Sequence, residues 1–316
     1  MRRVVSIVLL LSTFVAWAGA QQSGLPAKMT IMNGNTADVF LQRVEGGNLV
    51  FQANRSTRDL SGPIDKIYYL QFLSKLDGEL LVNLYSSADY AGMIQNIDQG
   101  LNSKTDEYWQ FMSINNNYKK VFLMLMESYF EVGNYEQAAA AGAGFAQNEE
   151  DDVAADKGRA MLIRLALMQD QIEEAEKRLE EVVTPSAKLY LTACIQQKKG
   201  EYKESIWSVS DLLEQYANDL DWVPQAELLN AVSYRLLADD EVVPYMDSAI
   251  STARQVKNIH VDSSCAGEAK QLQEQWILEK AEMLEKEQAR AAAMEKELEK
   301  VKKGTDEAAE EKDSQE

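Results

Sequence analysis

The stretch that decides the fold is Leu123-Met124-Leu125-Met126-Glu127-Ser128-Tyr129-Phe130-Glu131-Val132-Gly133-Asn134-Tyr135-Glu136-Gln137-Ala138. Its first half is apolar at helical spacing, and a second helical pattern opens at Tyr135. Between the two halves, Gly133 supplies a residue that adopts the left-handed backbone found at helix ends. The polar Asn134 then begins the next helix. The stretch therefore predicts two helices joined by a tight corner.

This corner recurs along the chain. In each copy a small residue ends one helix, an aromatic residue packs between the two helices, and a small residue one turn later lets the backbones approach. The copies are Ala88-Asp89-Tyr90, Gly133-Asn134-Tyr135, Asp170-Gln171-Ile172 (a weaker copy) and Gly200-Glu201-Tyr202, at intervals of 45, 37 and 30 residues. We expect these corner residues to be structural: Tyr90, Gly133, Tyr135, Ala138, Gly200 and Tyr202.

The recurring corner resembles the tetratricopeptide repeat, a helix–turn–helix unit of about 34 residues. The resemblance implies a helical array over residues 75–265, with a concave and a convex face that bind extended peptides or other proteins. The irregular intervals depart from the family pattern, and so does a hairpin near Tyr234 and Met246 that lacks the corner. An irregular helical bundle is the alternative interpretation.

Residues 25–73 show a different periodicity. Short alternating runs separated by Gly and Asn turns predict an antiparallel sheet bent into a small barrel. Met29-Thr30-Ile31-Met32-Asn33-Gly34, the Gly-Gly-Asn turn before Leu49-Val50-Phe51, and Ile64-Asp65-Lys66-Ile67 resemble the Sm-like barrel pattern. The resemblance implies a five-stranded barrel. We do not carry over the RNA binding of that family, because the chain has 32 basic and 51 acidic side chains, a net charge of −19.

The N-terminus has the three parts of a secretory signal peptide: basic Met1-Arg2-Arg3, the apolar run of residues 4–16, and Ala18-Gly19-Ala20 before Gln21. We therefore expect residues 1–20 to be removed by cleavage near Ala20 and the protein to be periplasmic or secreted. No later apolar stretch reaches the length of a membrane span, so we expect no transmembrane segment in the mature chain.

The sequence offers little chemistry. His260 is the single histidine, and no nucleophile elbow, phosphate loop or zinc motif occurs. We therefore predict no catalytic residue, no cofactor and no metal site. The run from His260 to Cys265 also contains Asp262 and two serines, residue types that a hydrolase uses. We interpret this run as a linker, and an enzyme with a site between barrel and repeats is the less favoured alternative.

Two groups of side chains have two interpretations each. Tyr108, Trp109 and Phe111 either line a partner-binding surface or belong to the core, since large aromatic side chains dominate both. Cys194 and Cys265 either form a disulfide, which an oxidising compartment permits, or remain free and buried. We favour the core for the aromatic side chains and free, buried thiols for the two cysteines.

Residues 266–303 are rich in Glu, Lys and Ala, with apolar residues three, four or seven apart, and predict a helix that caps the array and continues as a coiled coil. Residues 304–316 contain no large apolar side chain and are expected to be disordered. The whole chain is thus predicted to be mainly α. It suggests an exported, non-enzymatic scaffold or adaptor that binds proteins, with a role in envelope assembly. The alternative is a structural oligomer formed through the barrel or the C-terminal helix.

Overall fold

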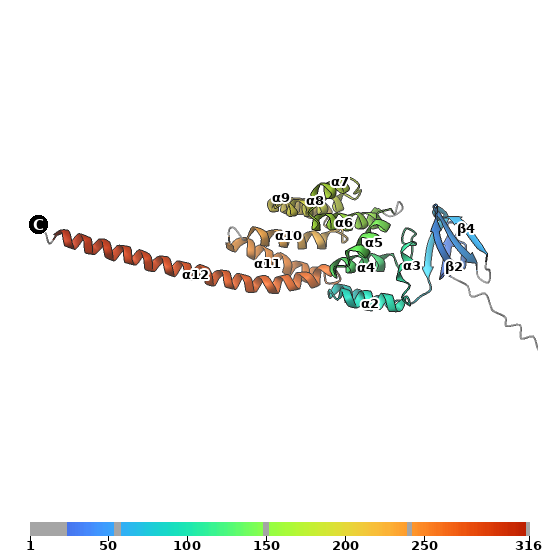
Figure 1. Cartoon of the computed structure of the whole chain (residues 1–316), viewed down its shortest axis with the longest axis horizontal. Helices are drawn as coiled ribbons and strands as arrows, with labels where there is room; N and C mark the ends of the chain where they lie inside the picture. Colours follow the sequence, from blue (N-terminus) through green and yellow to red (C-terminus); the bar gives the residue numbers. More distant parts are fainter. Residues whose placement is uncertain (1–23, 54–57, 148–151, 239–241, 314–316) are drawn as a thin grey trace, which may run out of the picture. The chain divides into compact units, whose positions relative to one another are not determined.

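The computed structural model describes residues 24–53, 58–147, 152–238 and 242–313, which form two compact units (Figure 1). The first unit ends at Leu73 and includes Asn115–Asn117, and the second comprises the remaining described residues. The predicted signal peptide, residues 1–20, lies outside the described residues.

The first unit is an antiparallel sheet of five strands in the order β4-β3-β2-β1-β5. The strands are β1 (Leu25–Ile31), β2 (Thr36–Glu45), β3 (Asn48–Ala53), β4 (Asp59–Pro63) and β5 (Ile67–Phe72), with the short helix η1 (Ile64–Lys66) between the last two. Side chains alternate between the two faces of the sheet along β1 and β2, and those buried on one face are Ala27, Met29, Val39 and Leu41. The predicted small antiparallel module is therefore present.

The two edges of this sheet are β4 and β5. On the β5 edge, the segment Asn115–Asn117 supplies further hydrogen bonds. The Phe72 amide donates to the Asn117 side chain at 2.8 Å, and the Leu70 amide donates to the Asn115 carbonyl at 2.9 Å. The described strands β4 and β5 do not pair with each other. Closure of the sheet into an Sm-like barrel therefore stays a prediction.

The second unit is helical. Its helices are α1 (Gly78–Ser86), α2 (Tyr90–Gly100), α3 (Thr105–Trp109), α4 (Lys119–Glu131), α5 (Tyr135–Ala146), α6 (Asp152–Met168), α7 (Ile172–Leu179), α8 (Pro185–Lys198), α9 (Tyr202–Tyr216), α10 (Val223–Leu237), α11 (Val242–Ile259) and α12 (Ser264–Asp313). Consecutive helices pack as hairpins, among them α4 with α5, α6 with α7, α8 with α9 and α10 with α11. This arrangement confirms the predicted fold class, a mainly α array of tetratricopeptide-like hairpins that follows a small antiparallel sheet.

The four predicted corners share one backbone geometry. Ala88, Gly133, Asp170 and Gly200 all lie in the left-handed region, with φ of 61°, 81°, 56° and 82°. In each corner the residue after the one with positive φ donates its amide to the carbonyl of the residue five positions before it. This hydrogen bond closes the end of the preceding helix. These bonds run from Asp89 to Leu84 (2.9 Å), Asn134 to Tyr129 (2.8 Å), Gln171 to Ala166 (2.9 Å) and Glu201 to Gln196 (2.9 Å).

The aromatic residues of two corners contact the helix that precedes them. The Tyr90 ring meets Tyr85 edge-on at 6.1 Å, and Tyr135 meets Phe130 in the same way at 5.7 Å. Ala138, one turn into α5, is fully buried, as expected where helix backbones approach closely. The corners thus combine a fixed backbone turn with a local ring contact.

Glycines also set two close approaches between helices. A Cβ on Gly158 of α6 would lie 2.5 Å from the Gly142 carbonyl oxygen of α5, so only glycine fits this crossing. A Cβ on Gly267 of α12 would lie 3.0 Å from the Ser86 carbonyl oxygen and 3.3 Å from the Ala88 Cβ. The last helix therefore contacts the first hairpin of the array.

The helix α12 continues through Gly304 to Asp313, and the disorder expected for residues 304–316 stays a prediction. The Glu, Lys and Ala side chains that make the segment too polar for a core are also good helix formers, so they extend a helix that is already nucleated. Residues 314–316 lie outside the described residues.

Replacing Gly133 by alanine is expected to lower the free energy of unfolding by about 1 kcal/mol, because an L-residue is strained at a positive φ. No other atom lies within 4 Å of the added methyl group, so the loss reports backbone strain alone. Urea unfolding followed by circular dichroism measures the change. Gly144→Ala is the matched control, because Gly144 lies in the exposed interior of α5 and alanine there should stabilise the helix by up to about 1 kcal/mol. Equal effects at both positions would contradict the role of the corner.

Candidate functional site

A cluster of charged and polar side chains forms where α2, α4, α6, α8 and α12 come together. Its centre is Arg164 of α6, whose guanidinium donates to Glu127 Oε2 and to Glu131 Oε1 of α4, both at 2.8 Å. Glu127 and Glu131 are four residues apart and so share one face of their helix. The guanidinium also lies 4.1 Å from the centre of the Phe130 ring, within range of a cation–π interaction.

We call the inner cluster the set of side chains that interact electrostatically around Arg164: Tyr90, Glu127, Glu131, Arg164, Tyr190, Cys194, Cys265 and Glu268. Burial opposes the charge on Arg164, but Glu127 and Glu131 outweigh this effect and raise the pKa of the guanidinium. The ion pairs at the centre therefore keep Arg164 charged.

The acidic members of the inner cluster are only partly neutralised. Burial raises the pKa of Glu131, and Arg164 offsets part of that rise. Burial and then the negative charge of Glu131 raise the pKa of Glu268. Three carboxyl groups thus share one guanidinium, so the cluster has an excess of negative charge when all of them are ionised.

The two cysteines lie on different helices, Cys194 on α8 and Cys265 at the start of α12, and both are free thiols in this structure. Burial raises the pKa of the Cys194 thiol to about 11 and that of the Cys265 thiol to about 12. Because the thiolate is the reactive form, neither group is activated as a nucleophile at neutral pH.

The structure places the aromatic group near residue 110 in or against the core of the helical unit. Tyr108 is 2% exposed and Phe111 is fully buried. Trp109 packs edge-on against Phe122 at 4.6 Å and against Phe145 at 6.0 Å. These side chains belong to the core, where they join the short α3 to the first hairpins of the array.

The residues of the His260 run do not converge on a catalytic arrangement. His260 Nε2 lies 2.8 Å from Glu227 Oε2 of α10, and Gln255 donates to the other oxygen of Glu227 at 3.0 Å. Ser263 Oγ accepts the backbone amide of Cys265 at the start of α12. The histidine therefore ties the end of α11 to α10, and the serine caps the next helix.

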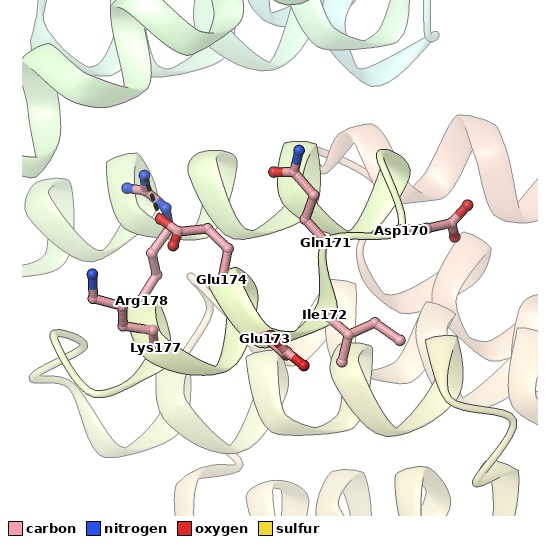
Figure 2. Close-up of a pocket in the computed structure, with 7 residues that line it drawn as sticks. All are labelled: Asp170, Gln171, Ile172, Glu173, Glu174, Lys177 and Arg178. Atoms are coloured by element: carbon pink, nitrogen blue, oxygen red, sulfur yellow. Dashed lines mark ion pairs between the residues drawn. The ribbon is translucent and has the colours of Figure 1, made fainter.

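A cavity of about 740 Å³ lies beside the α6–α7 corner (Figure 2). Its lining consists of Asp170, Gln171, Ile172, Glu173, Glu174, Lys177 and Arg178. Figure 2 shows these side chains spread around α7 rather than directed at one point. Glu174 and Arg178 neutralise each other at 2.8 Å, and Asp170 pairs with Lys198 of α8 at 2.5 Å. The lining is thus largely satisfied by internal ion pairs.

The sequence contained weak signals for the inner cluster. Glu127 and Glu131 are acidic residues at helical spacing within an apolar helix, and Arg164 interrupts the apolar stretch Met161–Leu167. Charged residues in such places need partners. The sequence alone does not identify those partners, because α4, α6 and α12 meet only through tertiary packing.

The described residues contain neither a metal-binding cluster nor a membrane-spanning helix. No group of three or more His, Cys, Asp or Glu side chains there is arranged to hold a metal ion. Within the same residues, no helix combines the length and the apolar character that crossing a bilayer requires.

No family model matches the sequence, and no curated protein matches it either. Solved structures with a similar fold include TTC0263, a thermophilic TPR (tetratricopeptide) protein of Thermus thermophilus. It is 14% identical over 65% of this chain and 96% of its own, with a TM-score of 0.40. The MamA protein is 14% identical over 57% of this chain and 92% of its own, with a TM-score of 0.30. The TPR2AB domain of yeast Sti1, solved in a complex with pHSP90, is 15% identical over 63% and 84%, with a TM-score of 0.28.

Replacing Glu268 by glutamine should raise the midpoint of thermal unfolding at pH 7. A carboxyl group whose pKa is raised in the folded state stabilises the fold when protonated, and this contribution is lost as the pH rises above the ordinary value of about 4.3 through the raised one. Glutamine cannot ionise, so the variant does not lose this stability as the pH rises. Variant and wild type should therefore differ in their unfolding midpoints at pH 7 and converge near pH 4. Differential scanning calorimetry at both pH values measures the effect.

Glu274→Gln is the matched control for this prediction, because Glu274 is an exposed residue of the same helix. It removes the same charge but lies outside the inner cluster. A gain at pH 7 that is equally large for both variants would show that overall charge, rather than the inner cluster, is responsible.

Proposed function

We propose that this protein is an exported, non-enzymatic scaffold that binds other proteins through the face of the helical array that carries the inner cluster. The observation that supports the proposal most directly is the excess of carboxyl groups over Arg164 in that cluster. Stacked hairpins commonly use one face to bind extended peptides. A face with uncompensated negative charge favours basic segments of a partner.

Export is part of the same proposal and rests on the N-terminal sequence. Arg2 and Arg3, the apolar run that follows them, and Ala18-Gly19-Ala20 have the order that a signal peptidase substrate requires. An exported scaffold with an acidic binding face is suited to organising basic partners in the cell envelope. The non-enzymatic assignment rests on the hydrogen bonds of His260 and Ser263 and on the packing of Cys194 and Cys265 in the hydrophobic core.

Binding can be tested with the mature full-length chain and two labelled extended peptides of equal length, one rich in Lys and Arg and the other rich in Asp and Glu. We expect fluorescence anisotropy to show binding of the basic peptide alone. The double variant Glu131→Gln, Glu268→Gln should weaken this binding about tenfold, from two charge contacts of roughly 0.5–1 kcal/mol each. The control is Glu173→Gln, Glu180→Gln, which removes the same charge from exposed positions on and just after α7.

The binding proposal fails if the acidic peptide binds as well as the basic one, or if both double variants behave alike. The second result would mean that overall charge attracts the peptide and that the inner cluster is not its site. Raising the salt concentration should weaken binding of the basic peptide, because exposed charge contacts are screened.

Export predicts a defined N-terminus. Expressed from its own start codon in a bacterium, the protein should be recovered from the envelope fraction with Gln21 as its first residue, as mass spectrometry of the intact chain would show. Ala20→Phe should block cleavage, because the peptidase requires a small residue there. Recovery of the wild type with Met1 in place, in the cytoplasmic fraction, would contradict export.

A further inference from the structure

The long helix α12 changes its surroundings near Leu284. Before that point Cys265, Ala269 and Trp276 are buried, and Met283 packs against the same core. Ion pairs secure the same half, since Lys280 reaches Asp247 of α11 at 2.5 Å and Glu279 reaches Arg235 of α10 at 2.8 Å. From Glu285 to Glu297 every side chain is exposed. In Figure 1 this second half of α12 continues past α10 and α11.

The exposed half of α12 is not uniformly polar. Leu284, Ala291 and Met294 lie at spacings of seven and three, which places them on one stripe of the helix. The sequence repeats the same spacing at Leu298 and Val301. In heptad positions, residues 284, 291 and 298 occupy a, while 294 and 301 occupy d, the two positions through which coiled-coil helices pack. Met294 is 67% exposed in the single chain.

We propose that the second half of α12 pairs with the same segment of a second copy of this chain, in antiparallel orientation. A lone helix gains little stability in water, whereas a paired one buries its apolar stripe. In the antiparallel register that places Ala291 opposite Met294, the two central layers each match a small side chain with a large one. The next layers place Glu287 opposite the Leu298 position, and the outer layers place Leu284 opposite the Val301 position.

Charge favours the same orientation. Glu287 occupies a d position, and a parallel in-register pair would bring the two copies of Glu287 together inside the seam, where like charges repel strongly. The antiparallel pair separates these two residues. It also places Arg290 opposite Glu297, both at g positions that flank the same two layers, and two-fold symmetry makes this contact twice.

Sedimentation equilibrium of the mature full-length chain tests the proposal. We expect twice the mass of one chain at about 100 µM, a concentration that reveals any dimer with a micromolar dissociation constant. The double variant Ala291→Glu, Met294→Glu should sediment as a monomer. The control Ala289→Glu, Ala293→Glu adds the same charge at positions f and c, away from the seam, and should remain a dimer with equal helicity by circular dichroism.

A charge exchange tests the orientation. Arg290→Glu should weaken dimerisation about tenfold, because two attractive contacts become repulsive. Adding Glu297→Arg should restore the wild-type dissociation constant. Restoration by Glu295→Arg instead would indicate a parallel pair, in which residue 290 opposes residue 295, and would overturn the proposal. A monomeric wild type, or a dimer that both double glutamate variants leave intact, would overturn it as well.

Discussion

The helical array depends on one backbone constraint, a single residue with positive φ at the end of the first helix in four of its hairpins. That residue lets the following amide reach back to the last turn, so the chain reverses within two residues and the next helix starts against the previous one. Gly133 and Gly200 adopt the conformation freely, whereas Ala88 and Asp170 adopt it at a cost of roughly 1–2 kcal/mol. That cost is tolerated because the packing of both helices fixes the corner. Corners with different sequences therefore produce hairpins of one kind.

Hairpins that all turn in the same way place side chains of their first helices beside one another. This explains why Arg164 of α6 meets Glu127 and Glu131 of α4 across separate hairpins. The approach of α12 to the first hairpin, permitted by Gly267, adds Glu268 to the same cluster. Packing by small residues thus brings like charges together. Burial, together with the neighbouring carboxyl groups, raises the pKa of Glu131 and of Glu268.

Local patterns in the sequence were sufficient for the hairpins, because a corner and the two helical periodicities that flank it are encoded within about 15 residues. The same is true of the strands, whose alternation and turns are short-range features. The position of Tyr108 and Phe111 could not be predicted, since an aromatic side chain looks the same in sequence whether it fills a core or a binding face. The inner cluster was missed for a related reason. Its ion pairs join residues more than 30 positions apart, and its carboxyl Glu268 lies on the last helix.

The two halves of α12 divide two tasks between them. The first half uses its apolar residues and charges within the chain, where Trp276 is buried and Lys280 and Glu279 form ion pairs with neighbouring helices. The second half is richer in Glu, Lys and Ala than the first, and its described side chains beyond Leu284 are all exposed. Its few apolar residues keep the seven-residue spacing, so they form a stripe that the array leaves uncovered. Because the inner cluster includes only the start of α12 and the apolar stripe is beyond the array, substitutions can test the proposed partner binding and the proposed self-association separately.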